Sequence, residues 1–135
     1  MHTFSVRTPR RIAFVEITEQ VQSDVQGAGV AAVVAVLVVA NTTEGVTINE
    51  NADPDVVHDL LLTLDRQFPK DAAGYRHAEG NSDSHIKASL MGSSCQVIVA
   101  GGRLVLGTWQ GIYLCEFDGP RTRQVHVQLL PAAGK

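Results

Sequence analysis

One apolar run constrains the fold of this 135-residue chain more than any other feature. The run VAAVVAVLVVA, from Val30 to Ala40, is rich in β-branched side chains and shows no polar alternation. This pattern is typical of a strand that is buried on both faces, so we expect it to form the central strand of a sheet. Because the run has only about half of the roughly 20 residues that cross a bilayer as a helix, it predicts no membrane segment.

Short strands and a helix are expected before this run. The segment FSVRTPRRIAFVEI holds two apolar pieces on either side of Pro9, which predicts two strand pieces with a kink between them. The segment ITEQVQSDVQGAG predicts a short amphipathic helix, with Thr18 as its cap and Val21 and Val25 on its buried face.

The second half of the chain predicts further strands and two helices. VTINE predicts a short strand, and the clearest helix begins after Asp53 and ends before Pro69. Its apolar stripe consists of Val57, Leu60, Leu61 and Leu64. IKASLMG predicts a short helix capped by Asp83 or Ser82. The segment from SCQVIVA to RLVLGTWQGIYLCEFDG predicts a hairpin that turns at two glycines, and RQVHVQLL predicts a last strand. Many strands and few helices predict a single-domain α+β sandwich over residues 1–135.

Charge and cysteine content narrow the classes of function. Eleven basic and fourteen acidic residues give a net charge of −3, and no basic patch stands out. A general nucleic-acid or anionic-membrane partner is therefore not expected. Cys95 and Cys115 lie in apolar strand segments without a basic neighbour, which predicts reduced core residues in a cytoplasmic protein.

The segment HAEGNSDSH is the densest group of candidate site residues. It places His77, Asn81, Asp83 and His85 within nine residues, a mixture that can bind a divalent metal ion or transfer protons. The spacing matches no standard zinc motif. An alternative interpretation is that Asn81 and Asp83 serve a turn and a helix cap while both histidines lie at the surface.

Three other polar groups interrupt core-like sequence. For each of them, a purely structural role is an alternative to a role in a functional site. Thr42 and Thr43 follow the central strand and can hold a phosphate or form a turn. Glu50 and Asn51 precede the helix capped by Asp53, so they too can serve the helix start. No constellation surrounds His2 or His126.

The remaining candidates are Trp109 with its neighbour Gln110, and a pair of arginines. Trp109 is the only tryptophan, and a lone Trp in a strand is more often a core residue than a ligand platform. Gln110 next to it alternates to the other face. Arg121 and Arg123 lie two apart on an expected strand, which suits either a bidentate grip on phosphate or two surface charges.

Three long strings resemble the YjbQ family, also called UPF0047 and secondary thiamine-phosphate synthase. They are TTEGVTINENADPDV, GYRHAEGNSDSHIKASLMGSS and GRLVLGTWQGIYLCEFDGPRTR. The resemblance extends from about residue 5 to residue 130. It implies an α+β domain with a mixed sheet, a homotrimer, and a polar site near the subunit contacts.

The activity that the resemblance implies joins hydroxymethylpyrimidine diphosphate to thiazole phosphate and releases pyrophosphate. His77, Asn81, Asp83 and His85 are the expected catalytic residues, and His77 and His85 are the expected ligands of a divalent metal ion, magnesium or zinc. Magnesium, the two arginines and the threonine pair would hold phosphate oxygens, and Trp109 would stack on the pyrimidine. The expected substrate-binding residues are Thr42, Thr43, Glu50, Asn51, Trp109, Gln110, Arg121 and Arg123.

This sequence departs from the family pattern at three positions. Family members usually have a histidine where this chain has Asn41, and a small residue where it has Glu44; Ile98 replaces a frequent proline. Because an amide is a weaker ligand for zinc-type metals than an imidazole, a tight metal site is less expected here. Two alternative functions remain open: a trimeric, non-catalytic module that binds a small phosphorylated metabolite, and a metal-dependent hydrolase.

Overall fold

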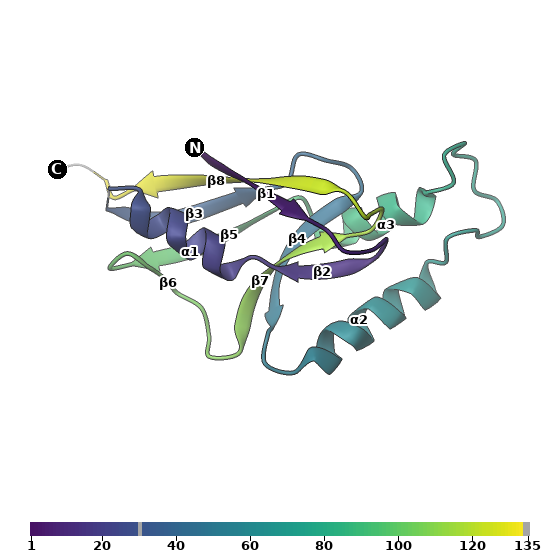
Figure 1. Ribbon diagram of the computed structural model, residues 1–135, viewed down its shortest axis with the longest axis horizontal. Coiled ribbons are helices and arrows are strands. Elements are labelled where there is room, and N and C mark those ends of the chain that lie inside the picture. Colours follow the sequence, from purple (N-terminus) through teal and green to yellow (C-terminus); the bar gives the residue numbers. More distant parts are fainter. Residues whose placement is uncertain (30, 134–135) are drawn as a thin grey trace.

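The computed structural model describes residues 1–29 and 31–133, which form eight strands and three helices (Figure 1). In chain order the elements are β1 (His2–Arg7), β2 (Ala13–Glu16), α1 (Thr18–Gly27), β3 (Ala32–Val38), β4 (Glu44–Glu50), α2 (Pro54–Gln67), α3 (Ser82–Met91), β5 (Ser94–Ala100), β6 (Arg103–Leu104), β7 (Gln110–Glu116) and β8 (Thr122–Pro131). They build a five-stranded sheet in the order β1-β8-β3-β5-β6 and a three-stranded sheet in the order β2-β7-β4. The expected α+β sandwich is confirmed.

The expectation of a mixed sheet is wrong. Every strand pair among the described residues is antiparallel. A parallel pair needs a crossover, usually a helix, that returns the chain to the same sheet. Here α1 leads from β2 in one sheet to β3 in the other, and α2 and α3 lead from β4 to β5 in the same way. The described helices therefore connect the two sheets to each other, and none of them forms a crossover within one sheet.

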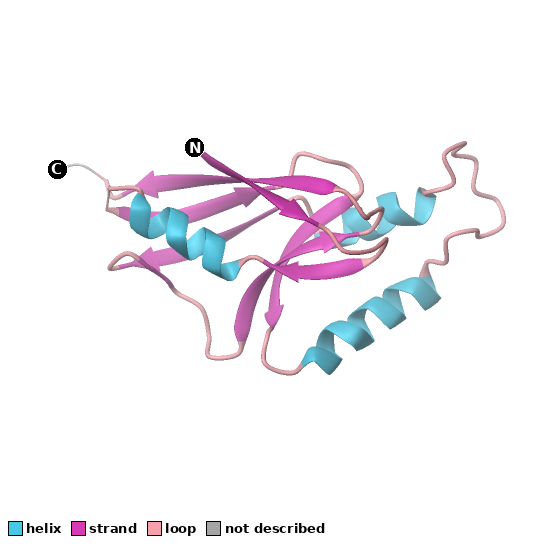
Figure 2. Cartoon of the chain, viewed as in Figure 1, coloured by secondary structure: helices cyan, strands magenta, loops and turns pink. Residues whose placement is uncertain are grey.

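The apolar run forms β3, which is the middle strand of the five-stranded sheet, as expected. Burial on both faces is wrong, because only one face is buried. Ala35, Leu37 and Val39 point into the core, whereas Val38 on the opposite face is 37% exposed. No second layer covers that outer face within the described chain (Figure 2). Val30, the first residue of the predicted strand, lies outside the described residues.

The main core lies between the two sheets and under α1. Val21 and Val25 of α1 are buried there, as predicted. Thr18 is not the helix cap, because the helix already begins at Thr18 and its side chain bonds elsewhere. The Thr18 hydroxyl donates to Glu16 Oε2 at 2.8 Å and accepts from the Ile112 N–H at 2.9 Å, which ties α1 to the three-stranded sheet.

Helix α2 begins as predicted but is not buried as its apolar stripe suggests. Asp53 Oδ1 accepts from the Asp55 N–H at 2.9 Å, and Pro54 is the first helical residue. Within α2, no residue is buried; Val57 and Leu64 only pack against a small second cluster around Phe117. Figure 2 shows α2 beside the three-stranded sheet, at one end of the molecule. Among the helices of the described part, none is long and apolar enough to cross a membrane.

Both cysteines are free thiols within or near the core, as predicted. Burial raises the pKa of Cys95 to about 11. Burial also raises the pKa of Cys115, with a smaller contribution from Cys95. Neither thiol is therefore an activated nucleophile.

Candidate functional site

The start of α3 brings two of the predicted histidines together. The rings of His77 and His85 lie edge to face, with centroids 5.3 Å apart. His77 comes from the long loop after α2, and His85 lies in the first turns of α3. They share a pocket of about 380 Å³, which we call the Tyr75 pocket; its lining residues are Tyr75, His77, Ser82, His85 and Ile86.

A larger pocket lies on the other side of His85, where α3 crosses the start of β4. It has a volume of about 440 Å³, and we call it the His85 pocket. The crossing depends on Gly45, because a Cβ there would lie 2.7 Å from Met91 Cβ and 2.9 Å from the Gly92 oxygen. The pocket is lined by Asn41, Thr42, Glu44, His85, Ala88, Ser89, Gly92 and Ser93.

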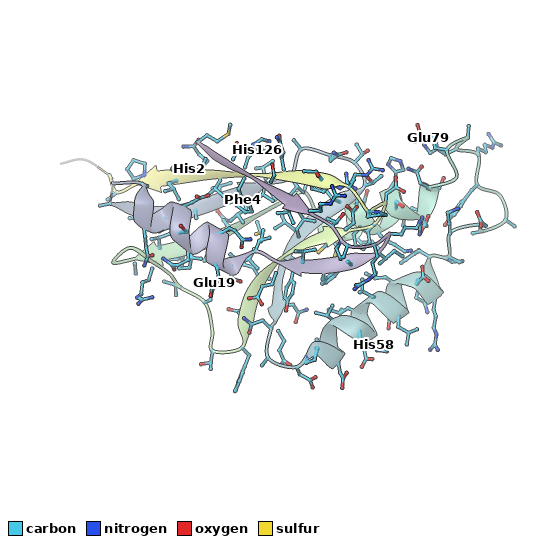
Figure 3. The ribbon with its side chains drawn as sticks, in the orientation of Figure 1. His2, Phe4, Glu19, His58, Glu79 and His126 are labelled. Atoms are coloured by element: carbon cyan, nitrogen blue, oxygen red, sulfur yellow. The ribbon has the colours of Figure 1, made fainter. Side chains whose placement is uncertain are left out.

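A third pocket, of about 330 Å³, shares two wall residues with the second. We call it the His126 pocket; its lining residues are Ala40, Asn41, Glu44, Thr122, Arg123, Gln124 and His126. The Thr3 hydroxyl lies 2.9 Å from His126 Nδ1, which leaves Nε2 as the nitrogen available to a ligand. Figure 3 shows His126 on the strand beside β1, which carries Phe4. No local pattern selects His126, because its neighbours in the pocket come from distant segments.

Glu44 lies between these two pockets, next to a buried arginine. Arg123 Nε hydrogen-bonds to Glu116 Oε1 at 2.9 Å, and its Nη2 bonds to Glu116 Oε2 and, at 2.8 Å, to Thr43 Oγ1. Glu44 Oε2 is also 2.9 Å from Arg123 Nε, but it has no aligned hydrogen bond. One guanidinium group thus faces two buried carboxyl groups and is committed mainly to Glu116.

This unequal sharing separates the pKa values of the two carboxyl groups. Burial raises the pKa of Glu44 to about 7, and Glu116 adds to the shift, while Arg123 and Arg121 oppose it. Burial alone would raise the pKa of Glu116, but hydrogen bonds from Arg123, the Asp118 N–H and Thr8 outweigh burial and lower it. Glu116 is therefore ionised at neutral pH, and Glu44 is poised to exchange a proton there.

Asp83 is neither a helix cap nor a free base, contrary to both interpretations of the sequence. Its side chain is fully buried, accepts from Arg11 Nη2 at 2.8 Å, and accepts from Lys87 Nζ at 2.8 Å. Burial opposes ionisation, but the bonds from these two cations lower the pKa of Asp83. Asn81 is likewise engaged, since its Nδ2 donates to Asp118 Oδ2 at 2.8 Å. Both residues hold α3 in place beside the pockets.

The two predicted arginines do not form a phosphate clamp. Arg123 is 1% exposed and is occupied by Glu116 and Thr43, whereas Arg121 lies at the surface, before the start of β8. Arg121 bonds to the Asp118 oxygen and to its carboxylate. Of the two threonines, Thr43 is buried against Arg123, and only Thr42 lines a pocket.

The remaining predicted residues lie at the opposite end of β4. Asn51 N–H donates to the Trp109 oxygen at 2.9 Å, and Gln110 Oε1 accepts from the Gly107 N–H at 2.8 Å. Glu50 pairs with Gln110 across β4 and β7. Since β4 runs from Glu44 to Glu50, its two ends are about 20 Å apart. The polar groups therefore do not converge on one cleft within a single chain.

Trp109 is exposed, so its interpretation as a core residue is wrong. The predicted hairpin does turn at Gly101 and Gly102, with φ of 58° and 76°, but its second strand β6 ends at Leu104. The chain then leaves the five-stranded sheet and enters the other sheet at Gln110. Trp109 lies in this passage and is 63% exposed.

A family model described as UPF0047 protein YjbQ-like matches residues 2–132. The chain belongs to this family. UPF0047 protein YugU of Bacillus subtilis is 45% identical over 130 residues, which cover 96% of this chain and 98% of that protein. The crystal structure of a YjbQ/UPF0047 protein of Clostridium acetobutylicum is 52% identical, has a TM-score of 0.93, and covers 96% of this chain and 100% of that one. A conserved hypothetical protein of Thermus thermophilus is 42% identical, with a TM-score of 0.90 and coverage of 96% and 100%.

The residues of this YjbQ-like chain do not fit a complete metal site. Within residues 1–29 and 31–133, no group of three His, Cys, Asp or Glu side chains is arranged to hold a metal ion. His77 and His85 face each other, but catalytic zinc keeps three protein ligands. Of the two carboxylates nearest in sequence, Asp83 is already paired with Arg11 and Lys87, and Glu79 lies 3.8 Å from His77 Nε2. We therefore derive no step through a metal ion.

Glu44 makes the stability of this YjbQ-like chain depend on pH near neutrality. Its pKa is about 7 in the folded state, above the ordinary 4.5, so its favourable contribution is present below pH 4.5 and is lost as the pH rises through 7. We expect the free energy of unfolding to fall by about 1 kcal/mol from pH 6 to pH 8 because of this group. Urea unfolding should show this difference in the wild type and in Glu19→Gln, an exposed control on α1 (Figure 3), but not in Glu44→Gln. An equal fall in Glu44→Gln would contradict the assignment.

Proposed function

We propose that this YjbQ-like chain binds a small phosphorylated metabolite in its adjoining pockets and acts there as a transferase. The candidate reaction is the one implied by the family resemblance, which couples hydroxymethylpyrimidine diphosphate to thiazole phosphate. The observation that carries the proposal is the series of three pockets: His85 is shared by the Tyr75 and His85 pockets, and Glu44 by the His85 and His126 pockets. Pockets of about 300–1,000 Å³ are the usual size for small ligands.

The chemistry of this reaction suits such a series of pockets. The bond between the pyrimidine methylene carbon and the diphosphate oxygen breaks, and pyrophosphate leaves with the bonding electrons. The thiazole nitrogen then donates its lone pair to the same carbon, which gives a thiazolium product. His85, in its protonated form, would donate a proton to the departing diphosphate on the side of the Tyr75 pocket, where His77 lies beside it.

Comparison of variants in the coupling reaction tests this assignment. We expect His85→Ala to lower the rate of thiamine phosphate formation from the two precursors by about 100-fold. This is the lower limit of the roughly 100- to 10,000-fold that a positioned proton donor typically contributes to a rate. His58→Ala is the matched control, because His58 is exposed on α2 (Figure 3). Arg121→Ala tests whether the surface guanidinium group helps to bind diphosphate. Equal rates in the wild type and His85→Ala would refute the assignment.

A homotrimer of cytoplasmic location remains part of the proposal. The outer face of the five-stranded sheet supports assembly because it carries exposed apolar side chains. Ile98 is 64% exposed and Leu130 is 44% exposed, and both are cross-strand partners of Val34 in β3. Assembly could also bring the Trp109 end of one copy to the pockets of another. Sedimentation of the preparations used in the coupling assay gives the number of subunits.

A non-catalytic binding module is the second candidate. It is favoured because several polar side chains that were expected to act on a substrate are already bonded within the chain. Arg123 and Thr43 bond to each other, and Asp83 is held by two cations. Titration calorimetry that shows tight binding of a phosphorylated precursor without turnover would support this function over the transferase. No observation favours the hydrolase.

A further inference from the structure

We propose that the His85 pocket is a site for a cationic nitrogen group, with the ionised Glu44 carboxylate as its counter-charge. The inference rests on the proposed function only for the identity of the cation. Four features support the site itself: the charge balance around Glu44, the burial of Glu44, the orientation of α3 and the composition of the pocket wall.

The charge balance around Glu44 leaves one negative charge in excess. The charged groups near it are Arg123 and Arg121 at β8 and Glu116 on β7. Arg123 is hydrogen-bonded to Glu116, and its Nε also lies 2.9 Å from Glu44 Oε2, so one guanidinium group faces two carboxyl groups. Because Arg121 is bonded to Asp118, ionisation of Glu44 adds a negative charge that no further cation balances.

The burial of Glu44 makes its charge costly. The residue is only 2% exposed, and its Oε2 is a buried atom without an aligned hydrogen bond. A second carboxylate charge beside one guanidinium group is poorly stabilised there, because water is kept away and Arg123 gives its aligned hydrogen bonds to Glu116 and Thr43. A bound cation would supply that stabilisation, and the pocket that Glu44 lines has room for a five-membered ring.

Helix α3 points its C-terminal end at the His85 pocket. Ala88, Ser89 and Gly92, at the C-terminal end of this helix, line the His85 pocket. The carbonyl end of a helix carries partial negative charge and favours cations. Helix α3 has no basic residue in its last turn, so nothing within the helix offsets that charge.

The wall of the His85 pocket contains no basic side chain that would repel a cation, provided that His85 is neutral. None of the eight described residues that line the His85 pocket is Lys or Arg. Its titratable groups are Glu44 and His85, and the other polar groups are the Asn41 amide and the hydroxyls of Thr42, Ser89 and Ser93. A neutral His85 leaves Glu44 as the only charged group in the wall.

This site deepens the proposed transferase reaction. Positive charge develops on the pyrimidine methylene carbon and ends on the thiazolium nitrogen. Fixed negative charge beside the place where positive charge develops lowers the barrier, because it needs no rearrangement during the reaction. Glu44 would act through its charge alone, so no proton or covalent bond is exchanged with the substrate.

A pair of matched probes tests the site in the full-length chain. The cation 3,4-dimethylthiazolium is compared with neutral 4-methylthiazole by amide chemical-shift titration at pH 6 and pH 8. We expect the cation to shift the amides of Thr42 and Ser93 and to bind about tenfold more tightly at pH 8, since Glu44 ionises through a pKa of about 7. The neutral probe should bind weakly and without this dependence.

Two variants show which group supplies the pH dependence. The other titratable side chains in the walls of the pockets that Glu44 lines are His85 and His126. In Glu44→Gln we expect binding of the cation at pH 8 to weaken about tenfold and its pH dependence to be lost, while Glu19→Gln behaves as the wild type. Thermal unfolding at pH 6 confirms that the variant is folded, since glutamine mimics the protonated acid.

Two results would overturn the inference: equal binding of the cation and the neutral probe, or a pH dependence that persists in Glu44→Gln. Neither result depends on turnover. A chain that binds the thiazolium through Glu44 but does not couple the precursors refutes only the transferase. A chain that couples them equally well after Glu44→Gln refutes only the role of this site in the coupling reaction.

Discussion

Replacement of Arg123 by methionine is expected to lower the free energy of unfolding by about 3–5 kcal/mol. Arg123 is the cation of a fully buried group in which Glu116 is its main partner and Thr43 and Glu44 lie against it. Methionine fills much of the same volume but leaves Glu116 as an uncompensated buried charge. Urea unfolding at pH 7 measures the loss.

The matched control for this variant is Arg121→Met. Arg121 has a side chain that is 46% exposed and bonds only to Asp118. Its replacement should cost less than about 1 kcal/mol. The double variant Arg123→Met with Glu116→Gln should recover part of the loss, because the buried charge is removed together with its partner. A loss below about 1 kcal/mol in Arg123→Met would show that the network is not needed for stability.

Replacement of Lys87 by methionine is expected to lower the free energy of unfolding by about 1–3 kcal/mol, because Asp83 loses one of its two cations. Lys87 is fully buried, and its Nζ donates to Asp83 at 2.8 Å and to Asp65 of α2 at 3.0 Å. Its loss leaves the buried Asp83 with Arg11 alone and removes a link between α2 and α3. The control is Lys70→Met, since Lys70 is about half exposed and 3.9 Å from Asp71.

Hydrogen exchange adds a local readout for Lys87→Met. The amides of α2 should exchange faster in this variant than in Lys70→Met, because few other buried contacts hold α2 to the chain. Equal exchange in both variants would mean that Val57 and Leu64 alone hold the helix.

Local patterns predicted most of the elements, because those patterns act within one segment. The β-branched run indicated the central strand, Asp53 and Pro54 indicated the start of α2, and the glycine pair indicated the hairpin turn. The outer face of β3 was misjudged for a related reason. An unbroken apolar run predicts burial, but which layer provides the burial depends on groups far away in the chain or on another copy.

The candidate site was predictable only in part. His77, His85 and Thr42 line the pockets, as their segments suggested. Asp83 and Arg123 were selected for their chemistry, yet both are buried ion-pair partners. Local spacing could have indicated the pairs Asp83–Lys87 and Arg123–Glu116, but not Arg11, which lies 72 residues from Asp83, or Thr43, which lies 80 residues from Arg123. Glu44 appeared only as a departure from the family pattern. Its raised pKa depends on Arg123 being committed to Glu116, which no local motif shows.

The position of Trp109 determines what the intrinsic fluorescence of this protein can detect. It is the only tryptophan of the chain, it is 63% exposed, and β4 separates it from the His85 pocket by about 20 Å. A ligand that enters the pocket of an isolated subunit will leave the emission unchanged. A change in emission on ligand binding would therefore report a neighbouring copy whose pocket lies against this indole.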